Sequence, residues 1–232
     1  MTAFHFGDGG ASHNRQTAHE YVREAVRSAI LRGSVPGGAR LIQADLASDL
    51  GVSTTPVREA LRDLATEGLI TLDAHRGAVV KQLSYEELVE IQSLTRLLDP
   101  EAMRRAATGG DGEHLVRAEA CAREMSAETD VGRWAELNRE FHELLATPLK
   151  DSRLHAILQG LRAAAAPYIA LALRQRGYEL DLAHEHHVAL VEALRAGDAK
   201  TAARLAREHV DLTTRTLAEA QQAFESPAPA DV

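Results

Sequence analysis

The chain of 232 residues is poor in cysteine and in aromatic side chains. Its single cysteine, Cys121, excludes an internal disulfide framework and is typical of a reducing cytoplasm. Aromatic residues make up 4% of the chain and hydrophobic residues 45%, so the core has to be built mainly from aliphatic side chains, which favours packed helices. No uninterrupted apolar run reaches the roughly 18 residues that span a bilayer, and residues 1–13 lack the layout of a signal peptide. We expect a cytoplasmic protein without membrane contact.

The chain also lacks an excess of positive charge. Its net charge is −8, which argues against a protein that binds nucleic acid without sequence preference. Basic and acidic residues balance over residues 1–83, and the whole excess of negative charge lies beyond them. If one part of the chain contacts phosphate, we therefore expect it to be the N-terminal part.

Turn residues and hydrophobic periodicity divide the chain into two parts. Residues 1–15 and 224–232 are rich in small and polar residues or in proline, and we expect both segments to be disordered. Residues 16–82 form short segments punctuated by glycine and proline, whereas residues 84–223 form long segments with helical periodicity. The sequence predicts a mainly α protein with an N-terminal and a C-terminal domain.

The N-terminal domain has the segment order of a winged helix-turn-helix. Helices are predicted over 19–32, 43–50 and 53–67, with Ser53 as the N-cap of the third helix and Gly51 ending the second. Two short strands are predicted over 69–72 and 78–80, around a turn that contains Gly77. Three helices followed by a hairpin predict a winged helix-turn-helix over 16–82.

The C-terminal domain is predicted to be an antiparallel bundle of six helices. Ser84 and Glu87 have the spacing of a capping box, which opens a helix with one apolar face: Leu88, Ile91, Leu94, Leu98 and Ala102. Further helices are predicted over about 112–128, 131–146, 151–176, 180–196 and 198–222. Short connections between helices of this length are typical of a bundle.

The third helix of the N-terminal domain has the residues that read DNA in a helix-turn-helix. The N-terminal part of such a helix enters the major groove, where hydroxyls and arginines reach bases and phosphates. Arg58 is suited to a guanine edge and Arg62 to a phosphate, and the turn between the strands is expected along the adjacent groove or backbone. The predicted DNA-binding residues are Ser53, Thr54, Thr55, Arg58, Arg62, His75, Arg76 and Gly77. The alternative is a small protein-interaction module in which these charges are merely solvated.

A family resemblance favours the DNA-binding interpretation. The run Leu50-Gly51-Val52-Ser53, then Thr55-Pro56-Val57-Arg58-Glu59-Ala60-Leu61, then Glu67-Gly68-Leu69 and Arg76-Gly77 closely resembles the GntR family of transcription regulators. The resemblance covers nearly the whole domain, and it implies that this helix reads the operator with Arg58 on bases. The family usually has arginine where this chain has Thr54, which implies a different operator sequence or affinity.

Four residues of the C-terminal part have spacings that allow a metal site. Asn138 and His142 are four apart and share a helix face, while His187 and His209 lie on consecutive predicted helices. Three imidazoles and an oxygen suit a divalent ion such as Zn²⁺ or Ni²⁺. Buried or surface histidines without a metal are the plainer interpretation, and the neighbouring His184 and His186 leave the choice of ligands open.

The segment from Ser84 onward resembles the FCD ligand-binding domain of the FadR subfamily, and its six helices resemble the VanR branch. Asn138-x-x-Phe141-His142 is similar to that domain's Asp-x-x-Phe-His motif, and the stretch from His187 to His209 matches its C-terminal pattern. The resemblance implies a divalent metal on Asn138, His142, His187 and His209, with an organic acid completing its coordination. Asn138 replaces the more common aspartate, which removes a negative charge.

The resemblance also implies an arginine that faces the effector on the first helix of this domain. Here the corresponding run reads Thr95-Arg96-Leu97-Leu98-Asp99-Pro100, so threonine stands at the expected position and Arg96 is displaced by one residue. Arg96 is therefore the tentative effector-binding residue, and a surface charge is the equal alternative.

Together these features predict a homodimeric, metabolite-responsive repressor without enzymatic activity. Two winged helices would read the halves of a palindromic operator on double-stranded DNA, and a small organic acid would shift the helical domains between two arrangements. Three alternatives remain: a regulator that senses the metal itself, a metal-dependent enzyme, and a regulator that binds acyl-CoA.

Overall fold

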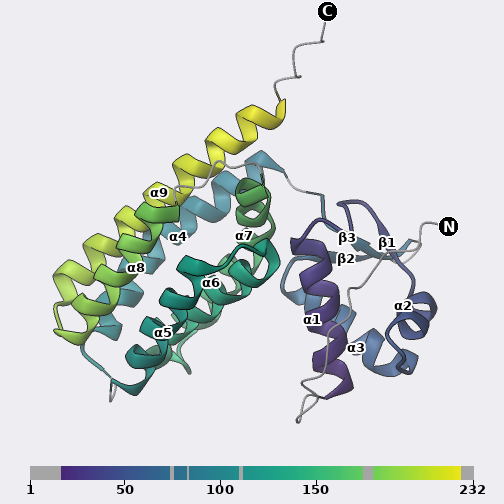
Figure 1. Cartoon of the computed structure of the whole chain (residues 1–232), viewed down its shortest axis with the longest axis horizontal. Coiled ribbons are helices and arrows are strands. Elements are labelled where there is room, and N and C mark those ends of the chain that lie inside the picture. The colour runs from purple at the N-terminus through teal and green to yellow at the C-terminus, as the bar shows by residue number, and fades with distance from the viewer. Residues whose placement is uncertain (1–16, 74–75, 83, 110–111, 175–179, 226–232) are drawn as a thin grey trace, which may run out of the picture. The chain divides into compact units, whose positions relative to one another are not determined.

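The computed structural model describes residues 17–73, 76–82, 84–109, 112–174 and 180–225. The chain divides into two compact units, residues 1–83 and residues 84–232, and each is described here by itself (Figure 1). The described residues are mainly helical, as the composition predicts, and the sheet is confined to the first unit.

The first unit is a three-helix domain with a small antiparallel sheet. Its elements are α1 (Ala18–Leu31), β1 (Arg40–Leu41), α2 (Gln43–Asp49), α3 (Thr54–Thr66), β2 (Ile70–Asp73) and β3 (Gly77–Val80). The strand order is β1-β3-β2, so β3 is central. Aliphatic residues at helical spacing fill the core between the helices, where these side chains are almost fully buried: Val22, Val26, Val57, Leu61 and Leu64. The winged helix-turn-helix prediction is confirmed.

Two details of this unit differ from the prediction. Strand β1 has only two residues, and its pairing with β3 joins Arg40 to Val79 across 39 positions of sequence, a contact that no local pattern reveals. Ser53 does occupy the N-cap of α3, but its side chain makes no capping hydrogen bond. Since that hydroxyl is exposed and not engaged by the helix end, it is available to an external partner.

The second unit is a ring of six helices. They are α4 (Tyr85–Ala106), α5 (Glu113–Ala127), α6 (Val131–Leu145), α7 (Arg153–Arg174), α8 (Leu180–Arg195) and α9 (Ala199–Glu225), with a short 3-10 turn η1 (Thr147–Leu149) after α6. The helices pack in the order α4-α9-α8-α5-α6-α7, α7 closes the ring on α4, and α7 also contacts α9 (Figure 1). The predicted bundle is confirmed, although α9 extends to Glu225 and so includes two residues expected in the disordered tail.

The core of the ring is built from aliphatic residues around Phe141 and Trp134. The apolar face predicted for α4 is correct at Leu88, Ile91 and Ala102, which are buried. It is wrong at Leu94, which is 40% exposed.

The start of α4 is more elaborate than the predicted capping box. The Ser84 hydroxyl accepts from the backbone N–H of Glu87, as expected. The backbone N–H of Ser84 does not reach the Glu87 carboxylate; it donates to the Tyr168 hydroxyl of α7 at 3.1 Å. That hydroxyl in turn donates to Glu87 Oε2 at 3.2 Å. A side chain from α7 therefore completes the cap of α4.

Helix α7 is long and apolar enough to cross a bilayer when only length and composition are considered. The sequence criterion of an uninterrupted apolar run does not detect it, since polar residues interrupt the helix. In the structure α7 packs against α4, α6 and α9, and it carries the buried His155 and the largely buried Arg162 into the domain. These contacts are those of a bundle helix.

Candidate functional site

The N-terminal half of α3 presents an exposed polar face opposite its buried apolar face. Val57, Ala60, Leu61 and Leu64 of α3 are buried in the domain core. The five predicted DNA-binding residues of this helix and its N-cap are all exposed: Ser53, Thr54, Thr55, Arg58 and Arg62. The apolar face of α3 is thus fixed against the domain core and its polar face is open to solvent, as insertion into a DNA groove requires.

The wing tip carries further exposed residues. Arg76 and Gly77 are exposed, and Gly77 has φ +74°, a conformation that favours glycine. The backbone N–H of Arg76 donates to Asp73 Oδ1 at 2.7 Å, and its carbonyl accepts from Arg40 Nε at 3.0 Å. Arg40 is an exposed cation beside the wing that sequence reasoning missed, because its place next to the tip depends on the β1–β3 pairing. The predicted residue His75 lies outside the described residues.

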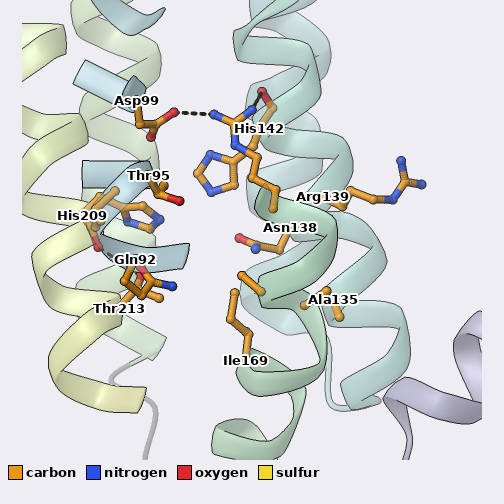
Figure 2. A pocket seen from close by; sticks show the side chains of 14 residues that line it. Gln92, Thr95, Asp99, Ala135, Asn138, Arg139, His142, Ile169, His209 and Thr213 are labelled. Atoms are coloured by element: carbon orange, nitrogen blue, oxygen red, sulfur yellow. Dashed lines mark hydrogen bonds and ion pairs between the residues drawn. The ribbon is translucent and has the colours of Figure 1, made fainter. Parts of the chain in front are cut away.

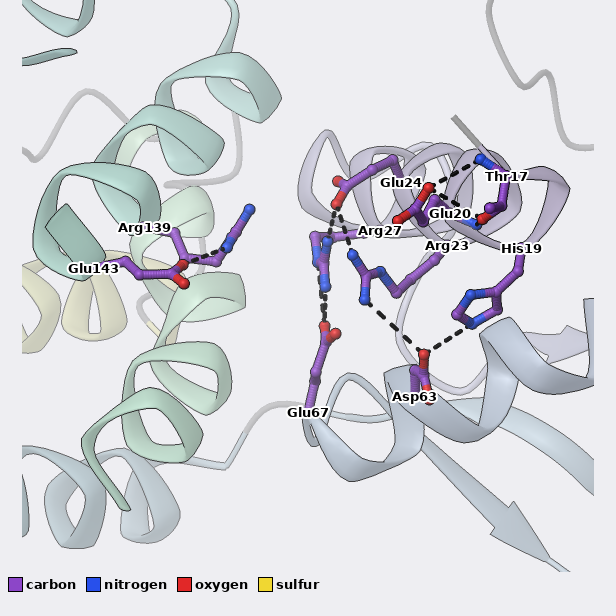
Figure 3. A network of polar contacts seen from close by, with 10 residues as sticks. All are labelled: Thr17, His19, Glu20, Arg23, Glu24, Arg27, Asp63, Glu67, Arg139 and Glu143. Carbon is purple, nitrogen blue, oxygen red and sulfur yellow. Dashed lines mark hydrogen bonds and ion pairs between the residues drawn. The ribbon is translucent and has the colours of Figure 1, made fainter. Parts of the chain in front are cut away.

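A polar network fixes α3 against α1 (Figure 3). Arg27 of α1 is 6% exposed and pairs with both Glu24 of its own helix and Glu67, which directly follows α3. Asp63 of α3 lies 2.8 Å from His19 Nε2, again joining the two helices. The orientation of the DNA-reading face therefore depends on charged contacts as well as on the apolar core.

Three of the predicted metal ligands meet in the second unit. His142 of α6, His187 of α8 and His209 of α9 are all buried, and their ligand atoms lie within 4.8 Å of one another. The ring centroids of His187 and His209 are 4.7 Å apart, and that of His142 is 5.6 and 5.2 Å from them. His186 lies farther off, with its ring 6.0 Å from His209, and His184 lines a different hollow. Of the candidate histidines, these three are the ones brought together.

The cluster contains buried polar atoms without a partner among the described residues. His187 Nε2, His209 Nδ1 and Asn138 Oδ1 are buried and make no hydrogen bond. Burial lowers the pKa of His209 to about 3 and holds the pKa values of His142 and His187 well below 6.5, with smaller contributions from neighbouring positive charge. All three imidazoles are thus neutral near pH 7, which is the form that binds a cation.

The cluster forms part of the wall of a cavity of about 60 Å³ that lies between α4, α6, α7 and α9 and is partly open to solvent (Figure 2). His142, His209 and Asn138 line it, with His209 on the side of Thr95 and Gln92 and Asn138 across the space from them (Figure 2). The remaining lining residues mix apolar and polar side chains: Gln92, Thr95, Asp99, Ala135, Arg139, Arg162, Ala165, Ala166, Ile169, Val210 and Thr213. One water needs about 10–15 Å³ of such space, so the cavity accommodates a molecule of only a few heavy atoms.

An ion pair between Arg162 and the buried Asp99 lies in the cavity wall. Arg162 also donates to the backbone carbonyl of His142 at 3.2 Å, so it braces one of the clustered histidines (Figure 2). Sequence reasoning missed this arginine. Its signal was available, since Arg162 is the charged residue in the middle of the apolar helix α7.

Arg96 lies outside this cavity. Its side chain is about half exposed and pairs with Asp211, with Nε 2.6 Å from Oδ1. The lining residue on this turn of α4 is Thr95. The structure therefore favours the surface-charge interpretation of Arg96 over its assignment as the effector anchor.

Comparisons with known proteins agree with this two-part organisation. The family described as bacterial regulatory proteins, gntR family, matches residues 18–80, and the FCD domain matches residues 90–212. A probable D-xylose utilization operon transcriptional repressor of Paenarthrobacter nicotinovorans is 31% identical over 198 residues, covering 84% of this chain and 87% of the relative. The gluconate operon transcriptional repressor of Bacillus subtilis is 30% identical over 155 residues, covering 65% and 63%.

Solved structures show the same fold. E. coli McbR/YncC superposes with a TM-score of 0.74 at 21% identity, covering 91% of this chain and all of that one. A GntR family transcriptional regulator from Pseudomonas syringae has a TM-score of 0.57 at 29% identity and covers 91% of both chains. The gntR family and the two relatives named above are regulators of transcription and not enzymes. The chain therefore belongs to the gntR family of bacterial transcriptional regulators and joins that family's DNA-binding domain to an FCD domain.

Proposed function

We propose that this regulator is a cytoplasmic, homodimeric repressor that reads a palindromic operator and responds to a small organic acid bound beside a divalent metal. The observation that supports it is the group of three buried, neutral imidazoles in and behind the wall of a cavity, with unpartnered atoms on His187, His209 and Asn138. A buried polar atom without a partner is costly, and a bound cation would satisfy all three.

The donor set fits a borderline divalent ion. Three imidazole nitrogens and one amide oxygen are suited to Zn²⁺ or Ni²⁺, and we assign His142, His187, His209 and Asn138 as the ligands. The bound ion would supply positive charge for a carboxylate. All four ligands are neutral, so they offset none of the positive charge of the ion. An anionic effector would offset that charge.

The names of the relatives agree with a metabolite-responsive repressor. One relative is a probable repressor of D-xylose utilization and another is the repressor of a gluconate operon. The cavity of about 60 Å³ has room for a small effector, and we favour this over an acyl-CoA.

Metal binding is tested by calorimetric titration of Zn²⁺ and Ni²⁺ into chelator-treated protein. We expect one tight site per chain, lost in His187→Gln. The matched control is His184→Gln on the same helix, which should bind metal like the wild type because His184 lies outside the cluster. Equal affinities in wild type and His187→Gln would overturn the assignment.

Effector binding is tested by thermal shift with small carboxylic acids, with and without metal. A ligand that binds the native state raises the apparent melting temperature, and we expect stabilisation that disappears on chelation. If metal alone changes operator affinity and no acid adds to it, the protein is a metal sensor instead. Failure of the dimer to bind any palindromic site from its own promoter region in a salt-sensitive manner would contradict the repressor role.

A further inference from the structure

We propose that Arg40 binds a backbone phosphate of the DNA and so clamps the wing tip, the turn between β2 and β3, to the duplex. The inference rests on the DNA binding of the proposed function and depends on neither the metal nor the effector. It is carried by the place of Arg40 in the sheet, by the hydrogen bond that fixes its guanidinium and by the charge that this bond leaves exposed.

The pairing of β1 with β3 places Arg40 on the solvent-exposed face of the sheet. Arg40 lies opposite Val79 of the central strand, and Thr71 of β2 lies opposite the same residue on its other side. Residues directly opposite one another in an antiparallel sheet share a face. Arg40 and Thr71 are exposed, whereas Val79 between them is 8% exposed. The long side chain of Arg40 therefore covers Val79 and keeps its charged end at the surface.

A hydrogen bond fixes the guanidinium of Arg40 at the wing tip. Its Nε donates to the backbone carbonyl of Arg76 at 3.0 Å. A guanidinium carries five N–H donors in one plane, and this bond uses one of them. Within the part of the chain that the structure describes, the two Nη atoms of Arg40 donate to no group. They form a fork that matches two oxygens of a phosphate, and a side chain that is already held in place loses little freedom on binding.

The hydrogen bond leaves the positive charge of Arg40 uncompensated. Arg23 and Arg27 of the same unit pair with carboxylates, whereas the partner of Arg40 is a neutral carbonyl. Among the described residues of the wing tip, Asp73 is the acidic one, and it accepts from the backbone N–H of Arg76. Basic and acidic residues balance over residues 1–83, so attraction to phosphate has to come from cations that lack a carboxylate partner.

The two edges of one guanidinium can serve the wing and the DNA together. Nε holds the carbonyl of Arg76 while the Nη fork faces outward. A phosphate bound by that fork is thereby joined to the backbone of the wing tip. We infer that Arg40 contributes affinity on every sequence, because a phosphate contact positions the protein and carries no base information.

Fluorescence anisotropy of the full chain with two labelled duplexes tests the phosphate contact. One duplex is a fragment of the protein's own promoter region and the other is a short duplex of mixed sequence. For Arg40→Gln we expect the slope of log K against log salt to fall by about 0.9 on both duplexes, and the affinity near 0.1 M salt to fall by about tenfold. A slope equal to that of the wild type would overturn the assignment.

Two further variants separate a local contact from a general effect of charge. Arg40→Lys keeps the charge and loses the fork, so we expect the wild-type slope and an affinity within about threefold of wild type. A slope as low as that of Arg40→Gln would show that charge is not what Arg40 supplies. Lys81→Gln removes the same charge at the end of β3 that is far from the tip. An equal loss of slope in Lys81→Gln would overturn the contact at Arg40.

Hydrogen exchange of the wing measures the clamp. Adding the mixed-sequence duplex should slow exchange in wild type and in Lys81→Gln, and this slowing should be severalfold smaller in Arg40→Gln at saturating DNA. Equal slowing in all three proteins would overturn the clamp. If wild-type protein binds neither duplex in a salt-sensitive manner, the DNA binding of the proposed function fails instead. Thermal melts of each variant without DNA show whether the fold is retained.

Discussion

Asn138 is the residue at which the candidate metal site departs from its family resemblance. Its buried Oδ1 has no partner among the described residues, beside three neutral imidazoles. We predict that Asn138→Asp tightens Zn²⁺ or Ni²⁺ binding by about tenfold or more, because a charged ligand binds a cation more strongly than an amide. The same change should lower the melting temperature of metal-free protein, since it buries an uncompensated carboxylate.

Competition with a chromophoric chelator measures the metal affinity of Asn138→Asp. Asn138→Leu is the opposite control, because it removes the oxygen and should weaken binding. If Asn138→Asp and wild type compete equally with the chelator, Asn138 is not a ligand.

The buried histidines make the stability of metal-free protein depend on pH. His142, His187 and His209 have folded-state pKa values below the ordinary 6.5, so protons bind the unfolded chain more strongly than the folded chain. The free energy of unfolding should be at its full value above about pH 6.5. It should fall as the pH drops toward 3, with a slope of up to about 1.4 kcal/mol per pH unit for each histidine.

Urea unfolding of chelator-treated protein at pH 8, 6.5 and 5 tests this dependence. A metal at saturating concentration should steepen it, because protons then also compete with the ion for the imidazoles. A free energy of unfolding that is flat between pH 8 and pH 5 would show that these imidazoles do not remain buried and neutral.

Among the elements, α3 carries the expected contacts with DNA. Arg58→Ala should weaken binding to the operator roughly 5- to 150-fold and relax base preference at one position, because a bidentate contact to a base contributes about 1–3 kcal/mol. Arg62→Ala should weaken binding to all sequences alike and reduce the slope of log K against log salt by about 1. Both side chains are exposed, so the melting temperature should not change. Fluorescence anisotropy over a salt series separates the two effects.

The contact between α1 and α3 depends on Arg27. Arg27→Met leaves Glu24 and Glu67 without their buried partner, and we expect a loss of about 2–3 kcal/mol in the free energy of unfolding. Arg23→Met is the matched control on the same helix. Its pairs with Glu24 and Asp63 are longer, 3.8 and 3.9 Å, and more exposed than those of Arg27, so it should cost less than about 1 kcal/mol. Equal losses in urea unfolding would contradict this account.

Local patterns were sufficient to predict most elements, and they failed where contacts are distant in sequence. The helices follow from apolar spacing and turn residues, as at Val57, Leu61 and Leu64 of α3. Strand β1 was not predicted, because two residues show no periodicity and the strand with which it pairs, β3, lies far along the sequence. The role predicted for Glu87 in the α4 cap was also wrong. The Ser84 N–H donates to Tyr168 instead, which lies 81 positions after Glu87 in the sequence.

The sequence was sufficient to predict the candidate metal ligands but not the cavity beside them. The spacing of His142, His187 and His209, with the family resemblance, singled out the histidines that meet. The pairing of Arg162 with Asp99 joins residues 63 positions apart, and no spacing rule indicates it. Arg96 was selected by its charge and its nearness to the expected position, whereas the helix turns Thr95 inward instead.

At the scale of the whole molecule, the ring of helices is joined to the DNA-binding unit at Ser84. The Tyr168 hydroxyl that receives the backbone N–H of Ser84 belongs to α7, and Ala165, Ala166 and Ile169 of that helix line the cavity. Burial raises the pKa of Tyr168, so the hydroxyl keeps the proton that it donates to Glu87. We predict that Tyr168→Phe retains operator and effector affinity separately but reduces severalfold the change in operator affinity that the effector causes. Anisotropy titrations of operator with and without effector measure this change, and an unaltered response would contradict the prediction.

The Tyr168 hydroxyl has a thermodynamic consequence for the protein as a receptor. A ligand can change the affinity for DNA only if its binding free energy differs between two arrangements of the chain. DNA binding then changes the affinity for the ligand by the same factor. Two hydrogen bonds link the Tyr168 hydroxyl of α7 to the start of α4, at 3.1 Å from the backbone N–H of Ser84 and at 3.2 Å to Glu87. Each such bond contributes about 1 kcal/mol. Coupling through these two bonds can therefore change the operator affinity by at most roughly 30-fold. Regulation through Tyr168 alone would therefore leave a measurable basal level of expression.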